Sequence, residues 1–110
     1  MVIKVTARHF KARDSIIDHA KESAESLEHF YDGITKADVI LSYEKAQNSS
    51  KVAEIKVAVY GAVLTGIARS EDFIKSIDQA TEKVLVQLKR YKEKLHSKKR
   101  KQARATRIQE

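Results

Sequence analysis

Apolar and polar residues alternate along several short segments of the chain, as they do in a strand with one buried face. Residues 2–6 alternate in this way, with Ile3 and Val5 on the apolar side. The same pattern predicts three further strands, over residues 37–45, 52–60 and 62–69. A turn cluster, Gln47-Asn48-Ser49-Ser50, and a tight turn near Gly61 separate them. Connections this short predict antiparallel pairing.

Two other segments carry apolar residues at three- and four-residue spacing, which is typical of an amphipathic helix. The first helix is predicted over residues 14–31, and Gly33 is expected to close it in a left-handed cap. The second is predicted to begin after Ser70-Glu71-Asp72, which supplies a cap and negative charge. Its apolar stripe consists of Phe73, Ile77, Ala80, Val84, Leu88, Tyr91 and Leu95.

The order strand, helix, strand, strand, strand, helix predicts an α+β fold. Two amphipathic helices need a shared apolar surface, which a four-stranded mixed sheet with both helices packed on one face provides. Gly66 lies inside the last strand, where the missing side chain lets a helix approach closely. We expect one α/β domain over residues 1–96. Beyond it, residues 97–110 are predicted to form a basic flexible tail that can become helical when bound.

Charge changes this picture because it is unevenly placed along the chain. The 110 residues carry a net charge of +7. Residues 1–82 hold 11 basic residues against 13 acidic ones, whereas residues 83–110 hold 11 basic residues against Glu93 and Glu110 alone. A solvated face explains scattered lysines but not this one-sided cluster. The cluster is typical of a protein that binds an anionic partner. Nucleic acid is the first candidate and an anionic membrane surface is the second.

The sequence offers little for catalysis or for a cofactor. It has no cysteine, which excludes disulfides, thiolate metal sites and thiol catalysis. The four histidines, His9, His19, His29 and His96, are too far apart to form a local metal motif. We therefore expect that the protein is not an enzyme and has no catalytic residue, metal or cofactor. No apolar run approaches the roughly 20 residues of a membrane span, and the start of the chain does not resemble a signal peptide.

The predicted second helix carries the main functional signal. Polar and basic residues follow three- or four-residue steps along one face, a spacing that can match phosphates along a folded RNA. These residues are Lys75, Gln79, Lys83, Gln87 and Arg90. Further cations broaden the face and continue into the tail, namely Lys89, Lys92, Lys94, Lys98, Lys99, Arg100 and Lys101. The favourable effect of the helix dipole falls off within the last turn, so it does not explain a run of this length. For the four tyrosines we expect core or edge packing.

Several segments of the chain, taken in order, resemble motifs of one protein family; the second predicted strand (residues 37–41 and 44–45) and the start of the second predicted helix (residues 72–73 and 77–78) follow its pattern, and three further segments match more closely. They are Val5-Thr6-Ala7-Arg8-His9, Leu27-Glu28-His29-Phe30-Tyr31-Asp32 and Gln87-Leu88-Lys89-Arg90-Tyr91-Lys92-Glu93-Lys94-Leu95. They resemble Ile-Thr-Gly-Arg-His, Leu-Glu-Lys-Tyr-Phe-Asp and Gln-Leu-Arg-Lys-Tyr-Lys-Asp-Lys-Leu of the ribosome hibernation promoting factor family, also called YfiA-like or ribosome-associated inhibitor proteins. The resemblance covers residues 2–96 and departs at Ala7, where the family often has glycine.

This resemblance implies the same fold and a cytoplasmic inhibitor of translation that acts under stress or in stationary phase. The implied partner is ribosomal RNA of the small subunit, in the channel where messenger and transfer RNAs lie. By position, the family's RNA contacts fall on Lys83, Lys89, Arg90, Lys92 and Lys94, with Arg8 and Lys11 in support. The chain resembles a short member that lacks the dimer-forming second domain, so we expect a monomer away from the ribosome.

Two other functions fit part of the pattern. A generic double-stranded-RNA-binding module also has a three-stranded sheet backed by two helices, but it lacks a first strand such as residues 2–6. A membrane-surface or protein-partner adaptor would need large apolar residues in a cationic helix, and residues 97–107 have none. We therefore expect no membrane partner.

Overall fold

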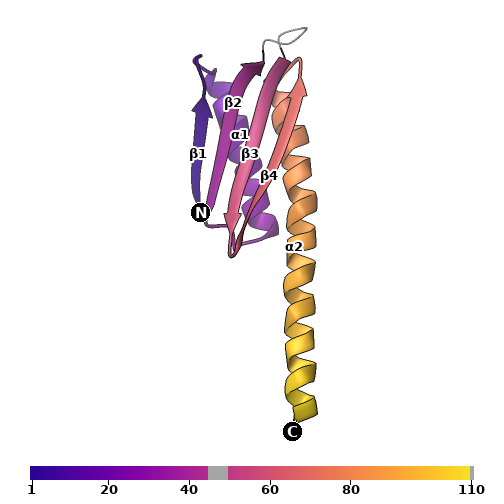
Figure 1. The fold of residues 1–110 in the computed structure, drawn as a ribbon. Coiled ribbons are helices and arrows are strands. Elements are labelled where there is room, and N and C mark those ends of the chain that lie inside the picture. The colour runs from indigo at the N-terminus through magenta and orange to yellow at the C-terminus, as the bar shows by residue number, and fades with distance from the viewer. Residues whose placement is uncertain (45–49, 110) are drawn as a thin grey trace.

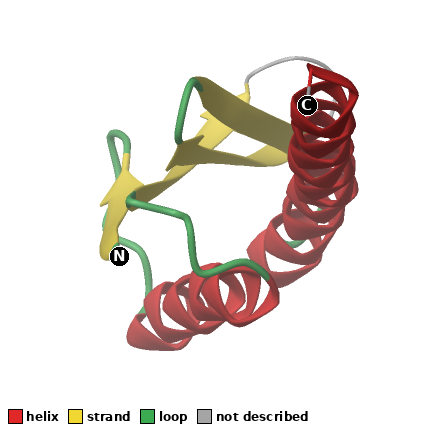
Figure 2. Ribbon diagram, turned by 90° about the horizontal axis from the view of Figure 1, so that it is seen from below, coloured by secondary structure: helices red, strands yellow, loops and turns green. Residues whose placement is uncertain are grey.

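The protein consists of one four-stranded sheet and two helices. The computed structural model describes the backbone of residues 1–44 and 50–109 and the side chains of residues 1–44 and 50–95. The elements are β1 (Val2–Ala7), α1 (Asp14–Phe30), β2 (Lys36–Glu44), β3 (Ser50–Val59), β4 (Ala62–Ser70) and α2 (Phe73–Gln109). Both helices lie on one face of the sheet (Figure 2). The predicted α+β fold is confirmed; Gln47, Asn48 and Ser49 of the predicted turn lie outside the described residues.

The sheet has the strand order β1-β2-β3-β4 and is mixed (Figure 1). β1 runs parallel to β2, whereas β3 is antiparallel to both of its neighbours. The register aligns Val5 with Val39, Val39 with Ile55, and Ile55 with Gly66, which makes one row across all four strands. Since side chains alternate between the two faces, this row lies on the side that the helices cover.

The core lies between that face of the sheet and the apolar stripe of each helix. The stripe of α2 is buried from Phe73 to Leu88, and Tyr91 and Leu95 are half-buried. The matching buried residues of α1 are Ala20, Ala24 and Leu27. Burial of a large aliphatic side chain stabilises the folded state by about 1.5–3 kcal/mol, so these stripes hold the helices on the sheet.

Gly66 allows the backbones of β4 and α2 to come together. A Cβ atom at this position would overlap the carbonyl oxygen of Ala80 and would lie 3.0 Å from Cγ2 of Val84. The close approach predicted for this glycine is therefore confirmed. The tight turn predicted near Gly61 is also present. Gly61 has φ +78° in the two-residue connection between β3 and β4.

The end of α1 differs from the prediction. The helix stops at Phe30, and Tyr31 caps it in an extended conformation (φ −146°, ψ 112°) with its N–H donating to the carbonyl of Leu27 at 3.0 Å. Gly33 has no positive φ, so the predicted left-handed glycine cap is wrong. Instead the ring of Tyr31 lies against Gly33, where a Cβ atom would come within 2.5 Å of it. The glycine is needed for space rather than for a turn.

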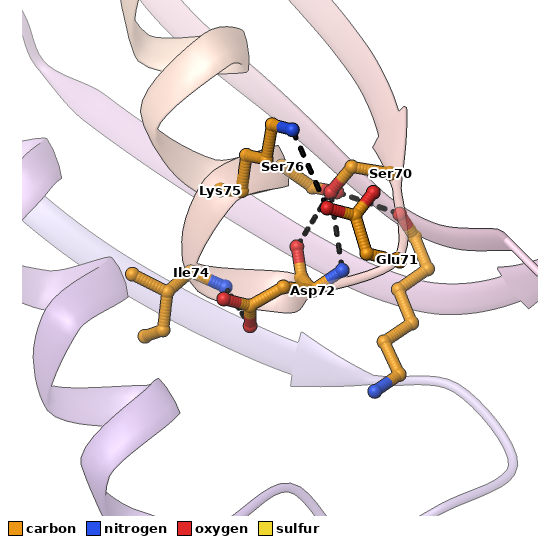
Figure 3. Close-up of polar contacts among 7 residues, drawn as sticks. Ser70, Glu71, Asp72, Ile74, Lys75 and Ser76 are labelled. Atoms are coloured by element: carbon orange, nitrogen blue, oxygen red, sulfur yellow. Dashed lines mark hydrogen bonds and ion pairs between the residues drawn. The ribbon is translucent and has the colours of Figure 1, made fainter.

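The first turn of α2 is capped as predicted by the residues before it (Figure 3). The N–H of Ile74 donates to Oδ1 of Asp72 at 3.1 Å, and the N–H of Asp72 donates to the hydroxyl of Ser70 at 3.2 Å. Ser76, which is fully buried, donates from its hydroxyl to the carbonyl of Lys51 in β3 at 2.7 Å. The first two bonds satisfy backbone N–H groups at the start of the helix, and the bond from Ser76 fixes α2 to the end of the sheet.

The backbone of residues 97–109 continues α2, where the sequence predicted a flexible tail. This segment contains neither proline nor glycine, and its lysine, arginine, glutamine and alanine residues have high helix propensity, so nothing ends the helix. Figure 1 shows α2 projecting well beyond the sheet. The division into a domain and a basic tail that acts separately stays a prediction.

We predict that Gly66→Ala lowers the free energy of unfolding by about 1–3 kcal/mol, because the new methyl group must push α2 away from β4. Urea unfolding would measure the change. Val63→Ala is the matched control, since Val63 lies in the same strand and is exposed; its effect should stay within about 0.5 kcal/mol. Equal stability of wild type and Gly66→Ala would contradict the close approach.

Candidate nucleic-acid interface

Most of the basic residues predicted to bind RNA fall into two groups along the domain. Lys11 belongs to the β1–α1 connection and Lys75 to the start of α2, and both segments lie at the end of the domain where the helices begin (Figure 1). Arg8 instead lines a pocket with Lys4 of β1 and Lys36 of β2. The second group begins at Lys89, 14 residues after Lys75 along α2, or about 21 Å at 1.5 Å per residue. Lys89, Arg90, Lys92 and Lys94 belong to this second group. The structure therefore separates Lys11 and Lys75 from the cations that begin at Lys89, although the sequence analysis combined them.

Lys83 and Gln87 both donate hydrogen bonds to the sheet, although Lys83 remains exposed. Nζ of Lys83 donates to the carbonyl of Ile67 at 2.5 Å, and Nε2 of Gln87 donates to the carbonyl of Thr65 at 2.6 Å. Both carbonyls belong to β4, an edge strand that has β3 on one side alone and therefore presents unpaired backbone groups on the other. The polar ridge predicted from sequence spacing is thus interrupted at these two positions. RNA binding by Lys83 stays a prediction.

The remaining cations of α2 are spread around the helix. Lys89 and Arg90 are exposed. Arg90 and Lys94 border a shallow groove over the start of β4, lined by Ala62 and Leu64. Lys92 turns the other way, with Nζ 5.1 Å from the ring centroid of Phe30 in α1, a cation–π contact. A ligand on the outer side of α2 would therefore meet Lys89 and Arg90 directly.

Tyr91 anchors this part of α2 to the rest of the domain. Its hydroxyl donates to the carbonyl of Tyr60 at 2.6 Å, and its ring meets that of Tyr31 edge-on at a centroid distance of 5.7 Å. Burial, and secondarily the neighbouring Tyr31, raises the pKa of Tyr91. The side chain of Tyr60 itself is 89% exposed, so the prediction of core or edge packing is wrong for that tyrosine. Only its backbone is used in the contact.

A hydrogen bond and an ion pair involve acidic residues of α2 or of the segment before it. Nε2 of His19 in α1 lies 2.6 Å from Oδ1 of Asp78 in α2, which links the two helices. Nζ of Lys75 lies 3.3 Å from Glu71. A backbone hydrogen bond, together with Lys75, lowers the pKa of Glu71. Lys75 is therefore partly neutralised where it stands.

Histidines are the candidate metal ligands that the sequence offers. His9 and His29 are exposed, and the side chain of His96 lies outside the described residues. Among the side chains that are described, no group of three or more histidine and acidic residues is arranged to hold a metal ion. Within the same part of the chain, no helix combines the length and apolar character needed to cross a membrane.

The structure adds basic residues that the prediction omitted. Arg13 and Lys51 join Lys11 at the end of the domain where the helices begin, around the rings of Phe10 and Tyr43. Arg13 belongs to the basic segment between the first strand and the first helix, so its position was visible in the sequence. Lys51 faces Tyr43 across the β2–β3 pair, which the hairpin register alone reveals. The side chains of Lys98, Lys99, Arg100 and Lys101 lie outside the described residues.

Comparison with known proteins identifies the family. Residues 3–96 match the family described as Sigma 54 modulation protein / S30EA ribosomal protein. The chain belongs to this family. A ribosome hibernation promoting factor of Pseudomonas putida is 29% identical over 97 residues, which are 88% of this chain and 92% of that protein. One from Azotobacter vinelandii is 30% identical over 94 residues, or 86% of this chain and 85% of that protein.

The fold of this chain is also found in a solved structure. The ribosomal subunit interface protein from Coxiella burnetii superimposes with a TM-score of 0.75 at 22% identity, over 84% of this chain and 98% of that one. The resemblance to YfiA-like hibernation factors that the sequence motifs indicated is therefore confirmed. The family consists of ribosome-associated factors rather than enzymes.

We predict that the double variant Lys83→Ala with Gln87→Ala lowers the free energy of unfolding by about 1–3 kcal/mol, since two carbonyls of β4 lose their donors. Urea unfolding measures the difference. The matched control, Lys89→Ala with Arg90→Ala, removes two exposed side chains of the same helix and should change stability by less than about 0.5 kcal/mol. Equal effects in the two double variants would show that the contacts to β4 contribute nothing.

Proposed function

We propose that this protein binds the small ribosomal subunit in the channel of messenger and transfer RNAs and thereby blocks translation under stress or in stationary phase. The protein would act in the cytoplasm, where it meets ribosomes, and would be a monomer away from them. Membership of the hibernation factor family supports the ribosome as the partner. The choice of the small subunit and of its channel rests on the resemblance and on the charge of α2.

The observation that carries the proposal is the outward position of Lys89 and Arg90, with which the basic half of α2 begins. Lys89 and Arg90 are exposed, while Leu88 on the opposite side is fully buried against the core. The core therefore holds the helix in place before any ligand arrives. Binding does not have to order the backbone at Lys89 and Arg90. Cations fixed on a helix suit the phosphates of a folded RNA surface, which is recognised mainly through its shape and backbone.

The fold favours this function over a generic double-stranded-RNA-binding module. β1 pairs in parallel with β2 along its whole length, from Val2 to Ala7, and completes a four-stranded sheet. Such modules have three strands, so the extra strand belongs to the ribosomal family. Blockage of the channel would then follow from the volume of the domain itself, because a bound protein excludes the RNAs that normally occupy the same space.

We predict that Lys89→Glu with Arg90→Glu abolishes binding to ribosomes while the fold persists. Both side chains are exposed and lie off the apolar stripe, so their reversal should change stability by less than about 0.5 kcal/mol each. Reversal replaces attraction to phosphate with repulsion. Cosedimentation of the purified variant with ribosomes measures binding, and circular dichroism verifies the fold.

The matched control for this reversal is Lys4→Glu with Lys21→Glu. Lys4 and Lys21 are exposed residues of β1 and α1, so the control makes the same change in net charge away from the basic half of α2. The control should still cosediment, at a moderately lower affinity because the long-range field is weaker. Loss of binding in both variants would mean that overall charge matters and the surface of α2 does not.

We predict that deletion of residues 97–110 weakens ribosome binding without abolishing it. The deletion removes six cations, Lys98, Lys99, Arg100, Lys101, Arg104 and Arg107, but no residue of the buried stripe. The melting temperature should therefore change little. In a cell-free translation assay, inhibition should persist at a higher protein concentration. Complete loss of binding in a normally folded truncated protein would place the RNA contact in the deleted segment.

A further inference from the structure

A cavity of about 290 Å³ lies at the end of the domain where α1 and α2 begin. It is far from Lys89 and Arg90, and Lys11 is the one residue of its lining that was predicted to contact RNA. Its volume is at the small end of ligand pockets, which measure about 300–1,000 Å³. The cavity can therefore take one small ligand rather than a large one.

Aromatic rings form one wall of this cavity. The ring of Phe10 stacks on that of Phe73 at a centroid distance of 5.1 Å with an interplanar angle of 9°, and the ring of Tyr43 meets both edge-on at 4.9 and 5.2 Å. Phe73 is buried and supports the other two, but Tyr43 remains 49% exposed. A packed and half-exposed ring of this kind is a surface on which a nucleobase can stack.

Three cationic side chains also line the cavity. Lys11 and Arg13 come from the β1–α1 connection, and Lys51 faces Tyr43 across the β2–β3 pair, with Nζ 5.7 Å from the ring centroid of Phe73. The acidic residue in the lining is Asp72, whose Oδ1 accepts the N–H of Ile74 as the cap of α2. Three cations against one engaged carboxylate make the cavity attractive to an anion.

The backbone that presents this wall is strained at one residue. His9 has φ +62°, a left-handed conformation that residues other than glycine adopt infrequently. The residue before it, Arg8, still continues the β1 ladder through its N–H to the carbonyl of Leu41 at 2.9 Å, and the residue after it, Phe10, already packs on Phe73. The chain thus turns sharply at His9 and brings Phe10 and Lys11 into the cavity. Such conformations cluster at functional sites.

We propose that this cavity binds one unpaired nucleotide, with the base on the ring of Tyr43 and the phosphate beside Lys11 and Arg13. The combination of an aromatic platform with neighbouring cations is the recognition chemistry of unpaired nucleotides. The inference deepens the proposed function, since on a ribosome the nucleotide would belong to ribosomal RNA and would give a second contact, distant from Lys89 and Arg90. A free mononucleotide carries the same chemistry.

The first test uses the full chain, labelled with ¹⁵N and titrated separately with AMP and with a short single-stranded oligoadenylate. We expect amide shifts concentrated at residues 10–13, at Tyr43 and Lys51, and at Phe73. Shifts there with the oligonucleotide alone would assign the site to a nucleotide within a strand, and shifts with AMP as well would show that free nucleotides also enter. Absence of shifts at these residues with both probes would overturn the proposal.

The second test compares two tyrosine variants by oligoadenylate affinity. Tyr43→Leu removes the stacking ring and should weaken binding by about tenfold. Tyr60→Leu is the matched control, because Tyr60 is even more exposed but lies at the opposite end of the sheet; its affinity should equal that of the wild type. Equal affinities of all three proteins, or equal losses in both variants, would overturn the stacking role.

A third variant keeps the proposal testable if Tyr43→Leu fails to fold. Lys11→Gln with Arg13→Gln retains the rings and removes the two cations that the proposal places beside the phosphate. Loss of up to two phosphate contacts should make the slope of log affinity against log salt shallower by about 1.4. An unchanged slope would overturn the role of these cations in binding phosphate.

Ribosome cosedimentation of the wild type separates this inference from the proposed function. Binding to ribosomes without any nucleotide-induced shift at the cavity would overturn the nucleotide site alone. Shifts at the cavity without binding to ribosomes would overturn the proposed function alone.

Discussion

The contact between the backbones of β4 and α2 at Gly66 determines the position of the side chains that the structure describes on α2, up to Leu95. Because no side chain separates the strand from the carbonyl of Ala80, the helix lies directly on the sheet. Three more contacts fix its rotation: Ser76 to the carbonyl of Lys51, Gln87 to that of Thr65, and Tyr91 to that of Tyr60. They occur along some four turns of the helix. With rotation fixed, the stripe from Phe73 to Leu88 faces the core and Lys89 and Arg90 face outward.

The same attachment reduces the positive charge that α2 presents to a ligand. Of the cations between Phe73 and Leu95, Lys75 pairs with Glu71, Lys83 donates to β4 and Lys92 lies over Phe30. Each is held by a contact within the domain, so its charge is directed partly inward. Lys89, Arg90 and Lys94 have no contact of this kind among the described side chains. Counting basic residues along the sequence therefore overstates the charge that an RNA meets along the described part of this helix.

The fold could be predicted from the sequence because its determinants are local. Alternation along the strands, the stripe of α2 and the cap at Asp72 are visible within a few residues, and Gly66 stands out inside a strand. The end of α1 could not be predicted, since it depends on the Tyr31 ring lying over Gly33. The contacts of Lys83 and Gln87 with β4 were missed for a related reason. Helical spacing reports which face a residue occupies, but not whether a neighbouring strand needs a donor there.

The topology also explains why the candidate interface has two parts. Both helices follow strands that end at the same end of the sheet, so the β1–α1 connection and the start of α2 meet there with Phe10, Lys11 and Lys51. Among the described side chains of α2, the cations without a contact inside the domain begin at Lys89, 16 residues after Phe73, or about 24 Å along the helix. At 3.4 Å per phosphate along one strand of a duplex, about seven phosphates cover that length. A short oligonucleotide can therefore occupy either part alone. An RNA surface as large as that of a ribosomal subunit can meet both parts at once, which would make binding to the ribosome tighter than binding to either fragment.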